Sequence, residues 1–346
     1  MAASKFPSSS KTAATHFEAT CAKISAFYFD LDNTLIPTRA GDSKAIRKLT
    51  DVLESQYQFN KDDAAQATQN FLKAFRRCPD NSQTSLDSWR THLWRESLPQ
   101  RYKHLAEQIY PQWLRLRYRY LAVPPDYVQL LLRMRQAGYA LALITNGPSN
   151  AQWEKVAKLH VRGYFDCVLV SSDLPWEKPH PEIFYAACNF LNVKPHECAM
   201  IGDKLETDIK GGHLAQLGLT FWTPLNSSSS AAQSLEDVEY RPHVKLGNLL
   251  EMYKYFPRLN AVHPPDTPTS LRSRRGSQMT SGSSGGSGSS GSSSSSSSNS
   301  GGSCEPAGSS LHHHQRSYQR VYRRGGSLPA MDCSNSEAEN SCDSFL

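Results

Sequence analysis

The chain has 346 residues, enough for one large domain or two smaller ones. Its net charge of +6 is small and dispersed, which argues against nucleic-acid binding. Eight cysteines without a CxxC pair or framework spacing indicate a reduced, intracellular protein. No apolar run approaches the roughly eighteen residues of a membrane span, so we expect no membrane partner and a cytoplasmic location.

Both ends of the chain differ in composition from the middle. Residues 1–22 are rich in Ser, Thr and Ala and are predicted to be a disordered leader; they also faintly resemble an organelle-targeting segment, although they lack arginine. Residues 258–346 are dominated by Ser, Gly and Pro, with seven consecutive serines at Ser292–Ser298. Such a tail buries too little apolar surface to offset its ordering entropy, so we predict disorder there. Within it, Arg272–Ser277 resembles a basophilic kinase site, so the tail is a candidate for phosphorylation or partner binding.

The first element of the folded part is a short apolar run at residues 26–29, which predicts a buried strand ending at Asp30. After Pro37 the apolar residues fall at helical spacing, and further helices are predicted at about 62–77, 84–98 and 101–121. No strand pattern interrupts them. Residues 37–124 are therefore predicted to be an all-helical insertion.

Strand and helix patterns alternate beyond Pro124-Pro125. The predicted helices lie at about 126–137, 149–159, 181–191 and 207–217, and the predicted strands at 140–144, 167–170, 198–201 and 218–222. Alternation of this kind indicates a parallel sheet covered on both faces. The fold class is therefore α/β, with a Rossmann-like parallel sheet core formed by residues 23–36 and 125–257.

Polar residues follow three of these strands directly. Asp30, Thr145 and Asp203 each stand at the carboxyl end of a strand, where open parallel sheets bind ligands. Asp30 is suited to attack phosphorus, and Asp32 to protonate the leaving alcohol and later deprotonate water. The backbone N–H groups of Leu31 and Asp32 are candidate phosphate donors. The alternative for this segment is an acidic turn after a strand.

The carboxylates also imply a metal. Asp30, Asp32 and Asp203 together would repel a phosphate dianion, and an oxygen-only ligand set points to Mg²⁺ as the cofactor. Thr145 and Asn146 offer a hydroxyl and an amide to a phosphoryl oxygen, and Lys178 offers a neutralising charge. Two alternatives stay open: Asn146-Gly147 is also a common turn, and a lone lysine is usually exposed.

Four segments carry a family resemblance, namely Asp30–Leu35, Thr145–Gly147, Lys178-Pro179, and Gly202-Asp203 followed by Asp208. In this order and spacing they resemble the active-site motifs of the haloacid-dehalogenase-type phosphatases, over roughly residues 24–256. The resemblance implies a nucleophilic Asp30 and an acid–base Asp32. It also implies that Mg²⁺ is bound by the side chains of Asp30 and Asp203 and the backbone carbonyl of Asp32. Asp208 would support these ligands from behind, although a helix-start acid there is equally explained by the macrodipole.

The resemblance also bears on the substrate. Asp32 indicates phosphoester hydrolysis, because members that release a halide lack an acid at that place. The insertion would be a cap, and the run Leu205–Gly212 together with Arg90-Thr91 resembles members that hydrolyse a sugar-acid phosphate. Arg90 would then pair with the carboxylate of a small-molecule sugar phosphate. Two alternatives remain: another small metabolite such as phosphoglycolate, or a phosphatase-like fold with a regulatory binding role.

Overall fold

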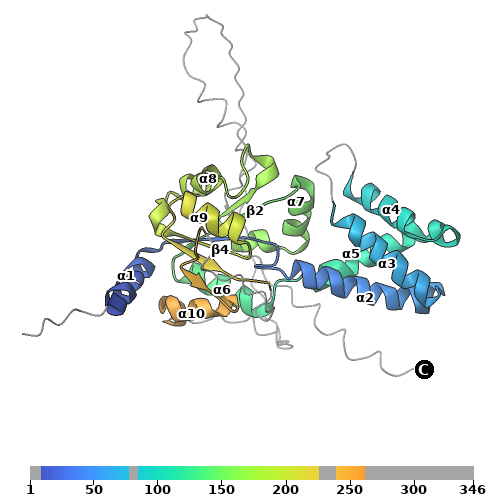
Figure 1. Ribbon diagram of the computed structural model, residues 1–346, viewed down its shortest axis with the longest axis horizontal. Helices are drawn as coiled ribbons and strands as arrows, with labels where there is room; N and C mark the ends of the chain where they lie inside the picture. The colour runs from blue at the N-terminus through green and yellow to red at the C-terminus, as the bar shows by residue number, and fades with distance from the viewer. Residues whose placement is uncertain (1–8, 78–84, 226–238, 262–346) are drawn as a thin grey trace, which may run out of the picture. The chain divides into compact units, whose positions relative to one another are not determined.

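The structure is a computed structural model, and it describes residues 9–77, 85–225 and 239–261 (Figure 1). The remaining residues lie outside this description. They include residues 1–8 of the predicted leader, most of the predicted tail, and the kinase-like sequence Arg272–Ser277. None of the described helices is long and apolar enough to cross a membrane.

The described residues form a parallel sheet of six strands in the order β3-β2-β1-β4-β5-β6. The strands are β1 (Ala26–Phe29), β2 (Ala140–Thr145), β3 (Cys167–Val170), β4 (Cys198–Gly202), β5 (Leu219–Trp222) and β6 (Val244–Lys245). β1 pairs with β2 on one side and with β4 on the other. The Rossmann-like parallel sheet is therefore confirmed. The two-residue β6 was not predicted, because so short a strand shows no hydrophobic period.

Helices cover both faces of the sheet, as Figure 1 shows. Side chains of β1 alternate between the faces: Phe27 and Phe29 join one apolar cluster, and Tyr28 joins the other. The helices are α6 (Pro125–Gln136), α7 (Ser149–Lys158), α8 (Pro181–Leu191), α9 (Lys210–Leu214) and α10 (Met252–Tyr255). Residues of α6, α7 and α10 belong to the cluster of Phe27, and residues of α8 to the cluster of Tyr28. This two-sided burial explains why the strands are almost continuously apolar.

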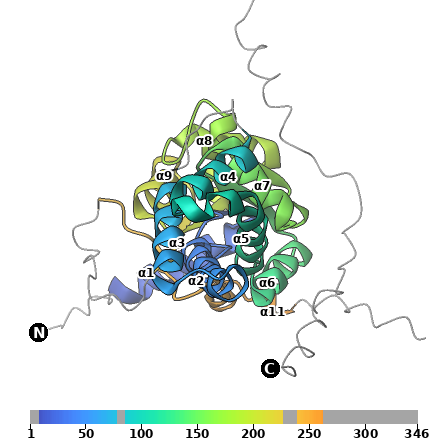
Figure 2. The same cartoon turned by 90° about the vertical axis from the view of Figure 1, so that its right-hand side faces the viewer.

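The insertion is helical, as predicted, and its helices lie side by side (Figure 2). They are α2 (Thr38–Tyr57), α3 (Lys61–Phe75), α4 (Leu86–Ser97) and α5 (Ala106–Tyr120), the last preceded by a 3₁₀ turn at Gln100–Leu105. Asn60 and Ser85 cap α3 and α4 by accepting hydrogen bonds from backbone N–H groups. Aromatic rings fill the centre: Phe71 stacks on Trp94 at 3.8 Å between ring centroids. The bundle therefore has an apolar core of its own.

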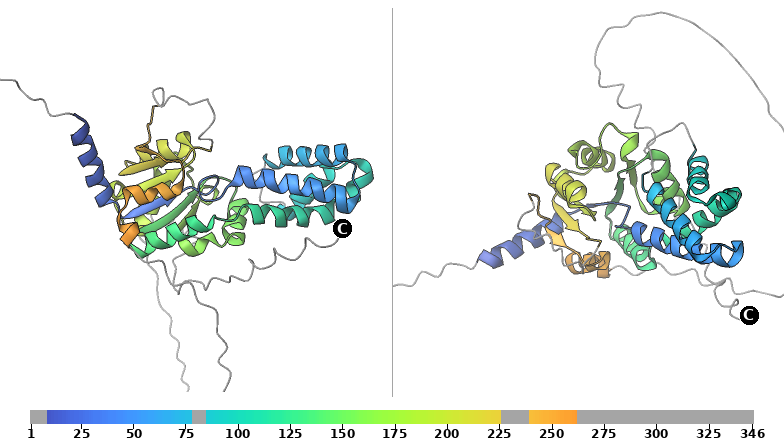
Figure 3. Two further views of the ribbon diagram at one scale, coloured as in Figure 1. Left: turned by 90° about the horizontal axis from the view of Figure 1, so that it is seen from below. Right: turned by 45° about the vertical axis from the view of Figure 1, so that its right-hand side comes forward.

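The structured region extends beyond both predicted bounds of the core. Residues 9–23 form α1 (Ser9–Lys23; blue in Figure 3), although residues 1–22 were predicted to be disordered. Phe17 contacts Tyr255 at 5.8 Å between ring centroids, and Cys21 is buried. At the other end α11 (Arg258–Ala261) buries Leu259 completely, although residues 258–261 were assigned to the tail. Both differences have one cause: composition averages over a segment and hides a few apolar anchors within it.

Candidate active site

Lys178 connects the end of β1, strand β2 and the turn that follows β4. Its Nζ lies 2.7 Å from Asp30 Oδ1 and 2.7 Å from Asp208 Oδ1. It also donates to the carbonyl oxygen of Ile144, in β2, at 2.7 Å. The side chain is almost entirely buried. Burial by itself would lower the pKa of Lys178, but the charges of Asp208 and Asp30 outweigh it and raise the pKa above its usual value.

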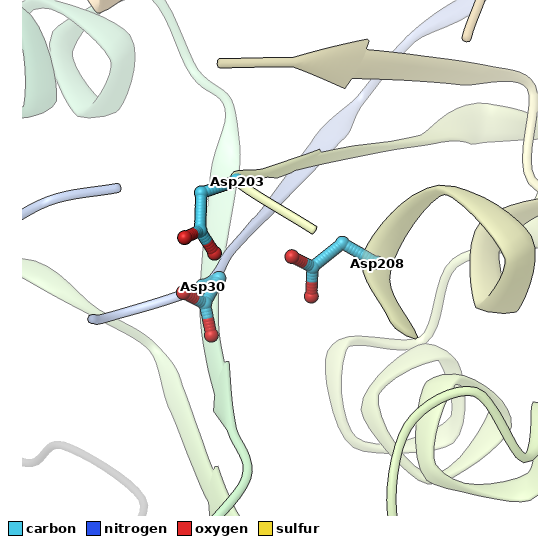
Figure 4. Close-up of side chains that lie close together, drawn as sticks. All are labelled: Asp30, Asp203 and Asp208. Carbon is cyan, nitrogen blue, oxygen red and sulfur yellow. The ribbon is translucent and has the colours of Figure 1, made fainter. Parts of the chain in front are cut away.

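Three carboxylates meet beside this lysine. Asp30, Asp203 and Asp208 each place an oxygen within 4.8 Å of the others, and Figure 4 shows the groups gathered around one space. Both carboxylate oxygens of Asp203 are buried without a hydrogen-bond partner. Burial, with the charge of Asp208 as a smaller cause, raises the pKa of Asp203 to about 6. Burial also raises the pKa of Asp30. Three carboxylates against one lysine leave negative charge unbalanced.

A divalent cation fits this cluster. All candidate ligands are carboxylate oxygens, which suit a hard ion such as Mg²⁺, and the two unpartnered oxygens of Asp203 are accounted for by such an ion. Asp208 lies in the cluster itself and not only behind it. Gly202 permits this, because a Cβ there would lie 2.2 Å from Asp208 Oδ2. A single π-turn, Leu205–Ile209, carries Asp208 to this position.

Asp32 has a different environment from Asp30. Its carboxylate accepts hydrogen bonds from Thr38 Oγ1 (2.5 Å), Gln152 Nε2 (3.1 Å) and Lys155 Nζ (2.8 and 2.6 Å to the two oxygens). Burial acts to raise the pKa of Asp32. The charge of Lys155 and these hydrogen bonds outweigh burial and lower the pKa to about 2. Two carboxylates two residues apart are thus held in opposite electrostatic settings.

The two predicted phosphate donors after β2 differ in what they contact. The hydroxyl of Thr145 is buried and has no hydrogen-bond partner, so it is available to a ligand. Asn146 instead uses its side-chain amide on the backbone of Lys178. Its Nδ2 donates to the Lys178 carbonyl at 2.8 Å, and its Oδ1 accepts from the Lys178 N–H at 3.0 Å. In this structure Asn146 therefore positions Lys178.

Leu31 separates the two carboxylates. It is completely buried, and its carbonyl accepts hydrogen bonds from the N–H groups of Leu35 and Ile36, both at 3.1 Å. These bonds close the turn after β1. The turn fixes Asp30 and Asp32 on the same sheet edge but directs them to different lysines, Lys178 and Lys155.

Arg90 is not part of the carboxylate cluster. It lies in α4 of the insertion, nearly fully buried, and its guanidinium is held by Glu154 of α7. Nη1 donates to Oε1 at 2.9 Å and Nη2 to Oε2 at 2.6 Å. The same group lies 5.8 Å from the ring of Phe75 and 5.9 Å from that of Trp113. The planar cation expected to await a substrate carboxylate is thus occupied by a carboxylate of the chain itself.

Gln152, Glu154 and Lys155 were missed by the sequence analysis, which treated residues 149–159 only as a covering helix. A signal was available. Gln152, Lys155 and Val156 have the i, i+3, i+4 spacing of a buried helix stripe, and the structure buries all three. This helix directly follows β2, whose end carries motif residues. Two polar residues in its buried stripe therefore indicate that the stripe faces a site and not only the core.

Comparison with known proteins gives consistent results. The model of the haloacid dehalogenase-like hydrolase family matches residues 24–216. N-acylneuraminate-9-phosphatase of Homo sapiens is 32% identical over 235 residues, which cover 66% of this chain and 92% of that protein. Glyceraldehyde 3-phosphate phosphatase of Pyrococcus furiosus is 31% identical over 234 residues, covering 66% and 93%. Among solved structures, a phosphatase of the same family from Thermococcus onnurineus aligns with a TM-score of 0.44 and 25% identity, over 67% of this chain and 97% of that one.

Proposed function

Because the chain belongs to the haloacid dehalogenase-like hydrolases and is a phosphoric monoester hydrolase, we propose that it hydrolyses a sugar phosphate through an aspartyl-phosphate at Asp30. The observation that carries this proposal is the buried cluster of Asp30, Asp203, Asp208 and Lys178. Its unbalanced negative charge is costly for a resting fold and matches a site completed by Mg²⁺ and a phosphate group.

In the first step, an oxygen of Asp30 attacks phosphorus and the bond between phosphorus and the sugar oxygen breaks. Asp32, in its protonated form, gives a proton to that sugar oxygen. Lys178 neutralises charge on Asp30 and on the transferring group, and the free hydroxyl of Thr145 holds a phosphoryl oxygen. In the second step, Asp32 takes a proton from water as the water oxygen attacks phosphorus. The carboxylate of Asp30 is restored and inorganic phosphate leaves.

The metal would be held by the side chains of Asp30 and Asp203 and the backbone carbonyl of Asp32, with Asp208 beside them. Bound there, Mg²⁺ offsets the repulsion between these carboxylates and the phosphate dianion. Lys178 supplies a fixed positive charge there, since it contacts both Asp30 and Asp208. The low pKa of Asp32 keeps its carboxylate ionised in this structure, so Asp32 must take up a proton before it acts as the acid of the first step.

For the substrate we propose N-acylneuraminate 9-phosphate, which gives free sialic acid and phosphate. Similarity over 92% of the human N-acylneuraminate-9-phosphatase supports this choice. Arg90 supports it too, because it already binds a carboxylate with both terminal nitrogens. We propose that the substrate carboxylate replaces Glu154 on Arg90. Glu154 keeps 16% of its side-chain surface exposed, so it has access to water when released.

The assay that tests the function measures phosphate release, with Mg²⁺ present, from three esters: N-acetylneuraminate 9-phosphate, glyceraldehyde 3-phosphate and glucose 6-phosphate. We expect the highest kcat/KM for the first. A clear preference for glyceraldehyde 3-phosphate would keep the reaction class but overturn the substrate, in line with the similarity to the Pyrococcus furiosus protein. No release from any phosphate ester would overturn the function.

Two variants test the exchange at Arg90. Arg90→Ala should lower kcat/KM for the acidic sugar by about 2–4 kcal/mol of transition-state binding and leave glucose 6-phosphate nearly unchanged. Glu154→Gln removes the competing charge and should lower KM for the acidic sugar. If both variants lose the same activity on both esters, the pair is a structural bridge and the substrate assignment loses its support from Arg90.

The compartment and the tail complete the proposal. Cys21, Cys167, Cys188 and Cys198 are unpaired buried thiols, which agrees with a reducing compartment. We therefore place the reaction in the cytoplasm. Residues from Arg272 to Ser277 are proposed as a site of phosphorylation or of partner binding, to be checked by mass spectrometry of protein treated with a basophilic kinase.

A further inference from the structure

Lys155 belongs to none of the expected motifs, but it contacts Asp32 more closely than any motif residue does. Lys155 places its Nζ 2.8 Å from Oδ1 and 2.6 Å from Oδ2 of Asp32. The same Nζ also donates a hydrogen bond to Gln152 Oε1 at 3.4 Å. An ammonium has three donors, and here all three point to partners. The side chain is 9% exposed, so this is a buried and fully occupied contact.

The two catalytic carboxylates thus have separate lysines. Lys178 comes from the segment before α8 and contacts Asp30, whereas Lys155 comes from α7 and contacts Asp32. Lys178 also bonds with Asp208 and a strand carbonyl, but the only acid that contacts Lys155 in the described part of the chain is Asp32. A buried lysine is costly unless it is paired, so its placement at this one carboxylate requires a reason.

The helix that carries Lys155 is held firmly. Trp153 Nε1 and Ser149 Oγ both donate to the carboxylate of Asp173, at 2.6 and 2.5 Å. Side chains that stand on a helix with locked neighbours hold a partner within a few tenths of an ångström, which proton transfer to a leaving oxygen demands.

We propose that Lys155 is a positioning residue of the phosphatase reaction, which orients the Asp32 carboxylate toward the leaving oxygen of the substrate. The inference rests on the proposed function. Lys155 holds both oxygens of Asp32 and so fixes the plane of the carboxylate. Thr38 donates to Oδ1 and Gln152 to Oδ2, but each offers one uncharged hydrogen bond, so without Lys155 the carboxylate is held more weakly.

The test compares two esters that differ in their need for a proton. An alkyl phosphate such as the sugar ester releases an alkoxide unless it is protonated, whereas p-nitrophenyl phosphate releases a stable phenolate. We use kcat/KM, because it includes only steps up to transfer of the phosphoryl group to Asp30. Lys155→Met should lower kcat/KM at least 30-fold for the alkyl ester and less than about 3-fold for p-nitrophenyl phosphate. KM should change less than kcat.

Two further variants complete the design. Lys155→Arg keeps a cation that can donate to both oxygens of Asp32. Its kcat/KM for the alkyl ester should lie within about 5-fold of the wild-type value. Lys158→Met alters an exposed lysine one turn further along α7 and should match wild type on both esters. If Lys155→Met does not fold, judged by its melting temperature with Mg²⁺, the arginine variant and Lys155→Gln serve for the same comparison.

Three results would overturn the proposal: equal losses on both esters, no loss on either, or faster hydrolysis of the alkyl ester. Equal losses would mean that Lys155 acts on the phosphoryl group or on the fold. Asp30→Asn, run in parallel, should abolish activity on both esters. A wild-type protein without activity on any ester would remove the proposed function and this inference together, whereas an active wild type with equal losses removes the inference alone.

Discussion

Buried charges occur in two regions of this protein, and they are arranged in opposite ways. At the sheet edge, Asp30 and Asp208 contact the same lysine, and both oxygens of the neighbouring Asp203 lack a partner. In the helical insertion, each buried arginine has its own carboxylate: Arg90 pairs with Glu154, and Arg117 donates to Asp42 Oδ1 at 2.8 Å.

This difference distinguishes a region that reacts with a ligand from a region that only positions it. In the insertion the guanidinium of Arg117 also lies 4.9 Å from the ring of Phe75, so its charge faces both a carboxylate and an aromatic ring, while its Nη1 has no hydrogen-bond partner. Such a region is stable as it stands. At the sheet edge the fold keeps a deficit of positive charge that only a ligand removes. Burial without balance therefore marks the reactive region, and balanced burial marks the region that positions it.

The largest expected effect falls on activity at the sheet edge. Asp30→Asn should lower kcat at least 1,000-fold, equivalent to about 4 kcal/mol of activation free energy, because the amide is not a nucleophile. Since the change removes one of three crowded carboxylates, the melting temperature should stay equal or rise. Asp51→Asn, at an acid with 70% of its side chain exposed, is the control for charge alone. Retention of more than a few per cent of wild-type activity would disprove the role of Asp30.

The converse holds for the insertion, where charge loss should cost stability. Arg117→Ala leaves Asp42 buried and unpaired and should lower the free energy of unfolding by about 3–5 kcal/mol, measured by urea denaturation. The double variant Arg117→Met/Asp42→Leu removes both charges and should recover most of this loss. A double variant as unstable as the single one would show that packing on Phe75, and not charge balance, holds this region.

Metal binding should stabilise the sheet edge in a pH-dependent way. The pKa of Asp203 is about 6 in the folded, metal-free protein, above its usual 3.8. Its stabilising contribution is therefore fully present below pH 4 and lost as the pH rises through 6. Mg²⁺ needs the ionised form, so saturating Mg²⁺ should raise the melting temperature by about 4–8 °C at pH 8 and much less at pH 5. Asp203→Asn should abolish the difference, and an equal shift at both pH values would contradict this site.

The smallest effect is expected from the end of the chain, which belongs to neither region. Removal of residues 262–346 should change the melting temperature by less than about 2 °C and leave kcat unaltered, because the segment has almost nothing to bury. Removal of residues 258–346 deletes the completely buried Leu259 as well and should lower the free energy of unfolding by about 2–4 kcal/mol. Equal stability of the two truncated proteins would show that α11 contributes nothing.

The sheet, the helical insertion and the motif residues at the strand ends could all be predicted from the sequence. Each of these is local: strand and helix periods are read within a few residues, and Asp30, Thr145 and Asp203 directly follow apolar runs. Parallel strands then bring those residues to one edge, so their approach follows from the topology alone. The burial of apolar residues such as Phe17 and Leu259 was not predicted, because their partners lie far away in the chain.

Only the tertiary structure decided which charges pair. Lys155 lies 123 residues from Asp32, and Glu154 lies 64 residues from Arg90. No local pattern encodes such a distance, because a pair forms wherever folding brings opposite charges together in a place without water. The same packing places the side-chain amide of Asn146 on the backbone of Lys178. The residue types of the site could therefore be predicted from the sequence, but the way that they hold one another depends on how the helices pack against the sheet.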